Sequence, residues 1–498
     1  MNGNIPRKEW NIIVLLLLST LVVFIAGTGG HLYSGDEEVN YVLAESIYHF
    51  HQFSLNNETS YSRAYTAYYD VTLFCRGHLS GSHGGRCYSW FGITEPVLAI
   101  PFIALAEFTG ITPWMFVEIL FYPIVTSVTC ALIYLMGLKL GYSRKVSVLL
   151  AFVYGFSTFA LPYSKFFNDG PLQVLFVVGA VLFLIGSRQS LVQAGTLVGF
   201  AVLTRIATVV IIPPIIVYVI WRNRHSVVRV LHFLLPICVA LAVFAGYNFV
   251  RFGSLTDFGQ GYSQSIGAYS ATCQGIQRLL ISPGVGLIYY FPLVLLVPYG
   301  AYRLFLTRAS EVLLFASFFI VSLVSSGSYC LVNFGFGSYN WIGWGHWGPR
   351  YLMGALPFLV LMLGKCITEN SIRGALRLTF YALFAVGVFV NALGELVWFQ
   401  VGFALVWGKF GSEWIPHALW QPEYSPIWEH FKVALGFVRD SQEIYPTNFG
   451  FGSITHQAYD PLLVNAFGPG IALLIVALPL ALLLYLLKRA LHQSQTAR

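Results

Sequence analysis

The chain has 498 residues, of which 57% are hydrophobic, 16% aromatic and 10% charged, and its mean hydropathy is +0.69. This composition excludes a soluble globular protein and indicates a membrane protein with many spans. The formal net charge of +7 does not indicate nucleic acid binding, because the basic residues are scattered between apolar runs and form no patch.

Apolar runs recur along the whole chain, and one membrane crossing requires about 20 mainly apolar residues. In chain order the runs lie at 11–29, 113–138, 146–163, 171–187, 191–204, 206–221, 229–249, 286–302, 312–328, 350–364, 378–399 and 464–487. The pattern predicts an all-α polytopic membrane protein with about 12 transmembrane helices. The run at 191–204 is short for a simple crossing, which favours a broken or tilted helix there.

The basic residues set the expected orientation, because cytoplasmic connections carry an excess of Lys and Arg. They fall on one side of the membrane if residues 30–112 form a single outer loop in which 96–109 lies along the membrane surface. If 96–109 crossed the membrane, the cation-rich connections would face outward, so charge favours the first arrangement. We therefore expect a multi-pass protein of the cell (plasma or inner) membrane with both termini cytoplasmic.

The start of the chain is interpreted as an uncleaved anchor. A short basic start followed by an apolar run also resembles a secretory signal, but no small-residue cleavage pattern closes the run. Cys75 and Cys87 share the first outer loop, and Cys273 and Cys330 lie in later outer segments. An oxidising compartment permits either pair to form a disulfide. The spacing of Cys and His is not of a metal-binding type.

Three consecutive carboxylates, Asp36, Glu37 and Glu38, follow the first apolar run. Acids at a membrane boundary of so apolar a chain indicate function. The segment 34–50 begins with a potential cap at Ser34 and repeats apolar residues at helical spacing, which predicts an amphipathic helix at the interface. The alternative is that the acids only stabilise the start of this helix.

A second junction between apolar runs, with the sequence YSKFFNDGPLQ at 163–173, faces the same compartment. Lys165 and Asp169 stand there at the end of a span, where a cation and a carboxylate suit a polar headgroup. The alternative for Asp169 is ordinary turn chemistry before Gly-Pro.

Arginines are rare on the outer side, yet Arg205, Arg251 and Arg350 each lie at or near the outer end of an apolar run. Such residues either extend to lipid phosphates or converge on a substrate phosphate through charge-assisted contacts. The proximity of carboxylates favours the second interpretation.

An aromatic segment at 339–350 interleaves Trp341, Trp344 and Trp347 with three glycines. It is typical both of an interfacial tryptophan belt and of a surface on which a sugar ring stacks. His346, within the same segment, is equally compatible with a structural and a catalytic role.

Seven segments of the chain together resemble a known family. They are, in order, SGDEEVNYVLAESI, WFGITEPVLAIPF, YSKFFNDGPL, GFAVLTRIAT, GYNFVRFGSLTDFG, LLISPGVGLIYYFP and WGHWGPRYLMGALPF. From about residue 30 to 365 the chain resembles the GT-C superfamily of polyprenyl-phosphate-sugar-dependent glycosyltransferases, in particular the protein O-mannosyltransferase and lipid A aminoarabinose transferase group.

The resemblance implies a GT-C fold with two surface helices in the first exoplasmic loop, at 36–50 and 96–109. It aligns the family's acid pair with Asp36 and Glu37, with Asp36 as the catalytic base, and the family's second acidic position with Asp169. The element at 95–98 differs from the family pattern, since it lacks the usual basic neighbour. No WWD-type signature is present, which disfavours transfer of a preassembled glycan to asparagine.

We therefore expect a hexosyl- or pentosyltransferase of cell-envelope glycan biosynthesis. It would move a sugar from a polyprenyl-phosphate donor to a hydroxyl of an exoplasmic glycan, lipid or protein acceptor, with inversion. The residues expected at the site are, for catalysis, Asp36, Glu37 and Asp169; for the substrate phosphate, Arg205 and Arg350, with Arg251 and Lys165 as substitutes; and for the sugar or acceptor, Trp344, His346, Trp347, Glu38 and Tyr41. No metal is required, although the carboxylates and His346 are able to host a divalent ion.

The catalytic module is expected at 1–365, including the loop 30–112, and the C-terminal spans at 366–498. Their exoplasmic loop at 400–463 is expected to cap the cavity or contact the acceptor. A secondary transporter of a polar or lipid-linked solute is the alternative function. It is disfavoured because no internal repeat is visible and the polar residues lie at the outer edge of the spans.

Overall fold

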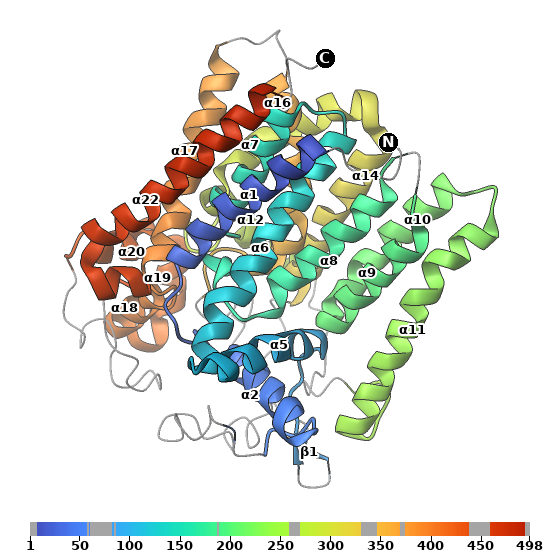
Figure 1. The fold of residues 1–498 in the computed structure, drawn as a ribbon, viewed down its shortest axis with the longest axis horizontal. Helices are drawn as coiled ribbons and strands as arrows, with labels where there is room; N and C mark the ends of the chain where they lie inside the picture. Colours follow the sequence, from blue (N-terminus) through green and yellow to red (C-terminus); the bar gives the residue numbers. More distant parts are fainter. Residues whose placement is uncertain are drawn as a thin grey trace.

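The computed structural model describes residues 7–56, 59, 82–83, 86–186, 189–257, 269–329, 346–368, 374–437 and 459–493. In these ranges the chain forms a bundle of long helices (Figure 1). The α-helices are α1 (Arg7–Ala26), α2 (Gly35–Phe50), α5 (Thr94–Thr109), α6 (Pro113–Lys139), α7 (Arg144–Phe156), α8 (Asp169–Leu184), α9 (Leu191–Thr204), α10 (Ile212–Arg222), α11 (Val227–Phe252), α12 (Tyr269–Ile281), α13 (Leu287–Tyr290), α14 (Val297–Tyr329), α15 (Leu356–Met362), α16 (Gly364–Thr368), α17 (Ala375–Leu396), α18 (Val401–Phe410), α19 (Trp414–Trp420), α20 (Pro426–Ala434) and α22 (Leu462–Gln493).

Short elements connect these helices. The 3-10 helices are η1 (Pro162–Ser164), η2 (Ile206–Ile211), η3 (Pro292–Leu296), η5 (Arg350–Ala355), η6 (Gly411–Glu413) and η7 (Pro422–Tyr424). The two-residue strands β1 (Ser82–His83) and β2 (Arg86–Cys87) pair antiparallel.

Among the described residues, seven helical segments are long and apolar enough to cross a membrane. They are Glu9–Ala26, Pro113–Lys139, Val227–Phe252, Pro292–Ser328, Arg350–Thr368, Ala375–Leu396 and Leu462–Gln493. Shorter apolar helices lie at Asp169–Leu184, Leu191–Thr204, Ile206–Arg222 and Val401–Phe410. The predicted helical membrane protein is confirmed, whereas the number of crossings stays a prediction.

Two breaks in these helices agree with the sequence pattern. Helix α9 ends at Thr204, and Arg205 is extended, with φ −147° and ψ 114°, before η2 and α10 continue the path. Helix α14 is interrupted at Arg308, with φ −141° and ψ 52°, between the two apolar runs predicted at 286–302 and 312–328. In contrast, α7 ends at Phe156, seven residues before the end of the predicted run at 146–163.

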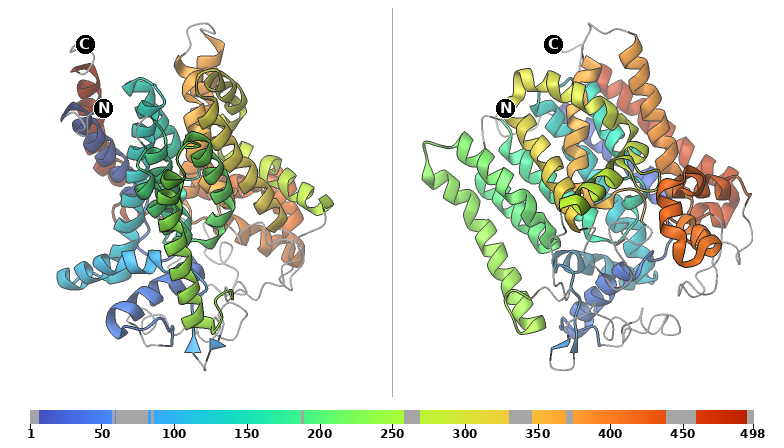
Figure 2. Two further views of the ribbon diagram at one scale, coloured as in Figure 1. Left: turned by 90° about the vertical axis from the view of Figure 1, so that its right-hand side faces the viewer. Right: turned by 180° about the vertical axis from the view of Figure 1, so that it is seen from behind.

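Helices α2 and α5 lie across one end of the bundle (Figures 1 and 2). Helix α2 begins after Ser34, whose extended backbone suits an N-cap, and α5 ends at Gly110, where φ is +73°. The loop before α5 approaches α9 closely, because a Cβ on Gly92 would lie 2.1 Å from the carbonyl oxygen of Leu203. Both helices predicted for the first outer loop therefore exist, and their contact with a membrane surface stays a prediction.

The catalytic module predicted at 1–365 and the C-terminal spans predicted at 366–498 share one hydrophobic core. Residues as far apart as Ile12 on α1 and Leu487 on α22 belong to the same buried cluster, and α22 packs along α1. A second cluster lies beneath α2 and α5 and contains Tyr41 and Phe167. The short helices α18 to α20 add a small third cluster.

The two cysteine pairs that the sequence permits to form disulfides differ in the structure. Cys87 is disulfide-bonded, and Cys75 lies outside the described residues. Cys273 is a free thiol, so the bridge to Cys330 that the sequence permits is not formed.

Candidate active site

Two carboxylate–arginine pairs meet where α2, α8, α9 and η5 come together. Nη1 of Arg350 lies 3.8 Å from Oδ2 of Asp36, and Nη1 of Arg205 donates to Oδ1 of Asp169 over 3.1 Å. The ring of Tyr351 joins the pairs, since its centroid is 5.0 Å from the guanidinium carbon of Arg350 and 5.5 Å from that of Arg205. These four charged residues are called the carboxylate–arginine cluster below.

Each member of the cluster stands at the end of a helix. Asp36 lies in the first turn of α2, and Asp169 is the first residue of α8, where Asn168 accepts a bond from the Gly170 amide. Carboxylates are stabilised at such amino termini by the helix dipole. Arg205 occupies the break after α9, and Arg350 begins η5 directly after a turn at Gly348, where φ is +67°.

The cluster is accessible yet poorly hydrated. Side-chain exposure is 31% for Asp36, 15% for Arg350, 20% for Arg205 and 11% for Asp169. Burial raises the pKa of Asp36, and the positive charge of Arg350 opposes that rise. Asp36 is therefore a stronger proton acceptor than an ordinary aspartate while it keeps access to a ligand.

Glu37, predicted beside Asp36 as a catalytic acid, is placed differently from its neighbour. It is only 1% exposed, and its Oε2 accepts the backbone amides of Tyr33 at 3.1 Å and Phe167 at 3.3 Å. Its Oε1 accepts the hydroxyl of Ser34. Burial raises the pKa of Glu37 well above its ordinary value, against these hydrogen bonds. Glu37 thus ties the start of α2 to the junction before α8.

Glu95, a residue that sequence reasoning did not assign to the site, lies next to the cluster. Its Oε1 accepts the hydroxyl of Tyr122 at 2.5 Å, and its Oε2 accepts the amide of Asn40 at 2.8 Å. Burial raises the pKa of Glu95 well above its ordinary value, and the negative charge of Asp169 adds to the rise. In the sequence, Glu95 stands directly before the surface helix predicted at 96–109, and the structure places it in the first turn of α5.

His346 and Tyr163 support Arg350. Nη1 of Arg350 donates to Nε2 of His346, which makes this nitrogen an acceptor because a guanidinium has no acceptor. The rings of His346 and Tyr163 are nearly parallel, with centroids 6.5 Å apart. Nε of Arg350 is buried and has no hydrogen-bond partner among the described residues. Buried polar atoms of this kind are suited to a ligand.

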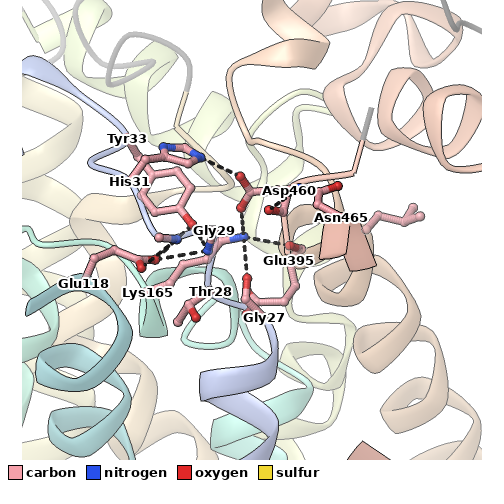
Figure 3. A network of polar contacts seen from close by, with 12 residues as sticks. Gly27, Thr28, Gly29, His31, Tyr33, Glu118, Lys165, Glu395, Asp460 and Asn465 are labelled. Atoms are coloured by element: carbon pink, nitrogen blue, oxygen red, sulfur yellow. Dashed lines mark hydrogen bonds and ion pairs between the residues drawn. The ribbon is translucent and has the colours of Figure 1, made fainter. Parts of the chain in front are cut away.

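Lys165, predicted as a substitute phosphate ligand, lies in a different environment (Figure 3). Its Nζ donates to Oδ2 of Asp460 at 2.5 Å and to the carbonyl oxygens of Glu395 at 2.7 Å and Gly27 at 3.2 Å. Its side chain is 0% exposed. Oδ1 of Asp460 lies 2.9 Å from Nε2 of His31. We call His31, Lys165 and Asp460, with the two carbonyl groups, the Lys165 network.

The Lys165 network joins distant parts of the chain. It connects the loops after α1 and before α8 with the end of α17 and the start of α22. Burial alone would raise the pKa of Asp460, but the charges of Lys165 and His31 lower it to about 2. Lys165 and Asp460 thus form an enclosed ion pair, whereas the side chain of His31 is 24% exposed.

Arg251, the other predicted substitute, is also enclosed by protein. It is 0% exposed, and it donates to the carbonyl oxygens of Ser89 and Phe91 and to Oδ1 of Asn248. Its guanidinium carbon lies 3.6 Å from the ring centroid of Tyr247. Arg251 therefore holds the end of α11 against the segment before α5 and does not join the cluster.

The predicted sugar-binding residues are mostly placed in the core. Trp347 is 0% exposed, and its Nε1 donates to Oδ1 of Asn391 at 3.3 Å. Tyr41 is 0% exposed and donates to Glu45, and Glu38 is half-buried on α2. Trp344 lies outside the described residues. His346 contacts the cluster directly, through Arg350.

Within the described part of the chain, no three His, Cys, Asp or Glu side chains are grouped closely enough to hold a metal ion.

Comparison with known proteins identifies one family. Residues 101–247 match the family model of dolichyl-phosphate-mannose-protein mannosyltransferases. This stretch contains Asp169 and Arg205, whereas Asp36 and Arg350 lie outside it. The match confirms the resemblance to lipid-phosphate-sugar glycosyltransferases that the sequence motifs indicate. No curated protein matches the chain in sequence.

Solved structures show distant likenesses. The archaeal oligosaccharyltransferase AglB from Archaeoglobus fulgidus, in complex with an inhibitory peptide and a dolichol-phosphate, is 12% identical over 89% of this chain, with a TM-score of 0.45. The chain spans 60% of the length of that protein. ArnT from Cupriavidus metallidurans, bound to undecaprenyl phosphate, is 13% identical over 86% of this chain and 76% of its own, with a TM-score of 0.46.

Proposed function

We propose that the chain is a membrane glycosyltransferase that moves a sugar from a polyprenyl-phosphate donor to an acceptor hydroxyl on the exoplasmic side. The observation that carries this proposal is the carboxylate–arginine cluster. It places a partly exposed carboxylate, Asp36, beside two partly exposed guanidinium groups, those of Arg350 and Arg205. The family match over 101–247 supports a lipid-phosphate-linked donor.

In the proposed reaction, Asp36 takes the proton of the acceptor hydroxyl while the acceptor oxygen forms a bond to the anomeric carbon. The bond between that carbon and the phosphate oxygen breaks, and its electron pair stays with the polyprenyl phosphate. Arg205 and Arg350 neutralise the negative charge that develops on this phosphate. A single displacement of this kind inverts the anomeric centre.

Asp169 and Glu95 have positioning roles in this scheme. Asp169 holds Arg205 at the break after α9. Glu95, whose raised pKa favours its neutral form, approaches the cluster without adding a third negative charge. The enclosed Lys165 and Arg251 are assigned structural roles, because neither side chain is exposed.

The test replaces Asp36 with Asn, which keeps the shape of the side chain and removes the base. Purified protein is given a set of radiolabelled polyprenyl-phosphate hexoses and pentoses, and sugar release and donor binding are measured. We expect the D36N variant to release sugar about 10²–10⁴-fold more slowly than the wild type, with donor binding retained. The matched control is Glu107→Gln on α5, an exposed acid that pairs with His49 at 3.0 Å, away from the cluster.

Wild-type turnover by the D36N variant would remove Asp36 from the role of base. The same proteins reconstituted in proteoliposomes test the alternative function, a secondary transporter. Flux of free substrate without sugar release would contradict a glycosyltransferase.

A further inference from the structure

A second candidate binding site lies at the other end of the bundle. The junction of α10 and α11 stands at the end away from α2 and α5 (Figure 1). Helix α11 has 26 residues and is thus about 39 Å long. It begins at this junction, and its last turn holds Arg251, which contacts the first outer loop. The two sites are therefore separated by the length of a membrane span.

The junction contains a cavity of about 440 Å³, within the usual range for ligand sites of about 300–1,000 Å³. Its basic lining consists of Arg222, Arg224, Arg229 and His225, with Trp221 and Ser310 beside them. None of the described residues that line it is acidic. We call it the arginine cavity.

The three arginines are not neutralised by the protein. Arg222 donates to the carbonyl oxygen of Gly186, and Arg224 donates to His225. Within the described residues, none of the three forms an ion pair with a carboxylate. Glu311, next to Ser310 in sequence, is 2% exposed and is directed to Ser310 and Arg308. The cavity thus concentrates uncompensated positive charge.

The wall of the cavity is fixed by a polar contact. Asn223 is 5% exposed and donates from Nδ2 to Oε1 of Gln189 at 2.9 Å and to the carbonyl oxygen of Val219. Ser226 caps α11 by accepting the amide of Arg229. These contacts hold the ends of α10 and α11 in place, so the arginines are presented from a defined backbone.

Apolar side chains continue from the cavity along the same helices. Val217 is 66% exposed, Ile220 47%, Val227 72%, Val228 61% and Leu231 56%. In a membrane protein, such a surface is covered by acyl chains. A ligand that fits both features has an anionic head for the arginines and apolar tails for the helices.

We propose that the arginine cavity binds the phosphate headgroup of an anionic membrane phospholipid. The guanidinium groups contact the phosphate oxygens, Trp221 lies at the level of the headgroup, and the acyl chains follow α10 and α11. The proposal concerns a site apart from the carboxylate–arginine cluster, and it does not depend on the reaction catalysed there.

The test is native mass spectrometry of the purified full-length chain titrated with phosphatidylglycerol, with phosphatidylcholine as the zwitterionic comparison. The variant R222Q/R224Q/R229Q removes the three charges. The control R377Q/K488Q/R489Q removes three exposed charges from α17 and α22, none of which lines the cavity. We expect the first variant to bind phosphatidylglycerol about tenfold or more weakly, and the control to bind it as the wild type does.

Three results would overturn the proposal. They are equal phosphatidylglycerol binding by the wild type and the cavity variant, an equal loss in the control variant, and equal binding of phosphatidylcholine. A further arm adds inorganic phosphate at millimolar concentration. If inorganic phosphate displaces phosphatidylglycerol, the site recognises a soluble phosphate and the lipid assignment fails. Circular dichroism of each variant verifies that helix content is unchanged, and the single variant R224Q gives a smaller loss of the same kind.

Discussion

The carboxylate–arginine cluster and the Lys165 network contain the same kinds of charged residue but differ in access. In the cluster, side-chain exposure ranges from 11% to 31%. In the network, Lys165 is 0% and Asp460 2% exposed. A cation that donates to protein carbonyls and a carboxylate has few donors left for a substrate, whereas Arg350 retains a buried Nε without a partner among the described residues. The cluster and the Lys165–Asp460 pair therefore differ in access and not in the kinds of charge that they contain.

The largest expected effect comes from breaking the Lys165 network. Lys165→Met leaves Asp460 without its buried lysine partner, and removal of one member of a buried pair costs about 3–5 kcal/mol. We expect a loss of this size in the free energy of unfolding, measured by thermal denaturation in detergent. The double variant K165M/D460N should recover part of the loss, because the buried carboxylate is then no longer left without its lysine partner. Unchanged stability of K165M together with weakened donor binding would instead place Lys165 at the substrate.

The second prediction concerns the arginines. Arg350→Gln removes a charged donor from the cluster, and such a contact is worth about 1.5–3 kcal/mol. The kcat/KM for the polyprenyl-phosphate donor should therefore fall about 10–100-fold, with little change in stability. Arg251→Gln is the matched comparison, and it should lower stability because it loses the contacts with Ser89 and Phe91. If R350Q lowered mainly stability and R251Q lowered mainly kcat/KM, the distinction between the cluster and the enclosed Arg251 would be wrong.

Substitutions of Glu37 are expected to have a smaller effect on stability, and they distinguish a structural from a catalytic carboxyl group. Because burial raises the pKa of Glu37 well above its ordinary value, its neutral form is favoured, and Gln is a close substitute. We expect E37Q to keep both fold and turnover, and Glu37→Ala to lose about 1–3 kcal/mol of stability through three lost hydrogen bonds. A stable but inactive E37Q protein would restore Glu37 to a direct catalytic role.

The helices and the cluster could be predicted because their signals are local. Apolar runs indicated the long helices, and the four cluster residues each stand at a helix end that the sequence displays. Asp36 follows an apolar run, Asp169 precedes Gly-Pro, and Arg205 interrupts two apolar runs. Their convergence was a hypothesis that rested on the carboxylates near the arginines and on the family resemblance.

The enclosed residues could not be recognised in the same way, because their partners are far away in the chain. Lys165 and Arg251 look like Arg205 in the sequence, a single cation at the end of a span. Asp460 is 295 residues from Lys165, and Ser89 is 162 residues from Arg251. Trp347 was similarly indistinguishable from a sugar-stacking residue, although Gly394 packs so tightly against its ring that a Cβ would lie 2.5 Å away. Long-range packing decides which of several similar residues remains accessible.

The smallest expected effect is a pH dependence of stability within the Lys165 network. Burial alone would lower the pKa of His31, but its hydrogen bond and ion pair with Asp460 raise the pKa above the ordinary value of 6.5. The protonated form therefore stabilises the fold fully below pH 6.5, and this contribution is lost as the pH rises through the higher folded-state pKa. Since the side chain of His31 is 24% exposed, the contribution is expected to be under about 1 kcal/mol. His31→Gln should remove it, so thermal denaturation should show wild type and H31Q converging as the pH rises. A difference in stability between wild type and H31Q that is the same below pH 6.5 and above the folded-state pKa of His31 would show that His31 acts through neutral hydrogen bonding. The charged pair with Asp460 would then have no part in holding α22 against the bundle.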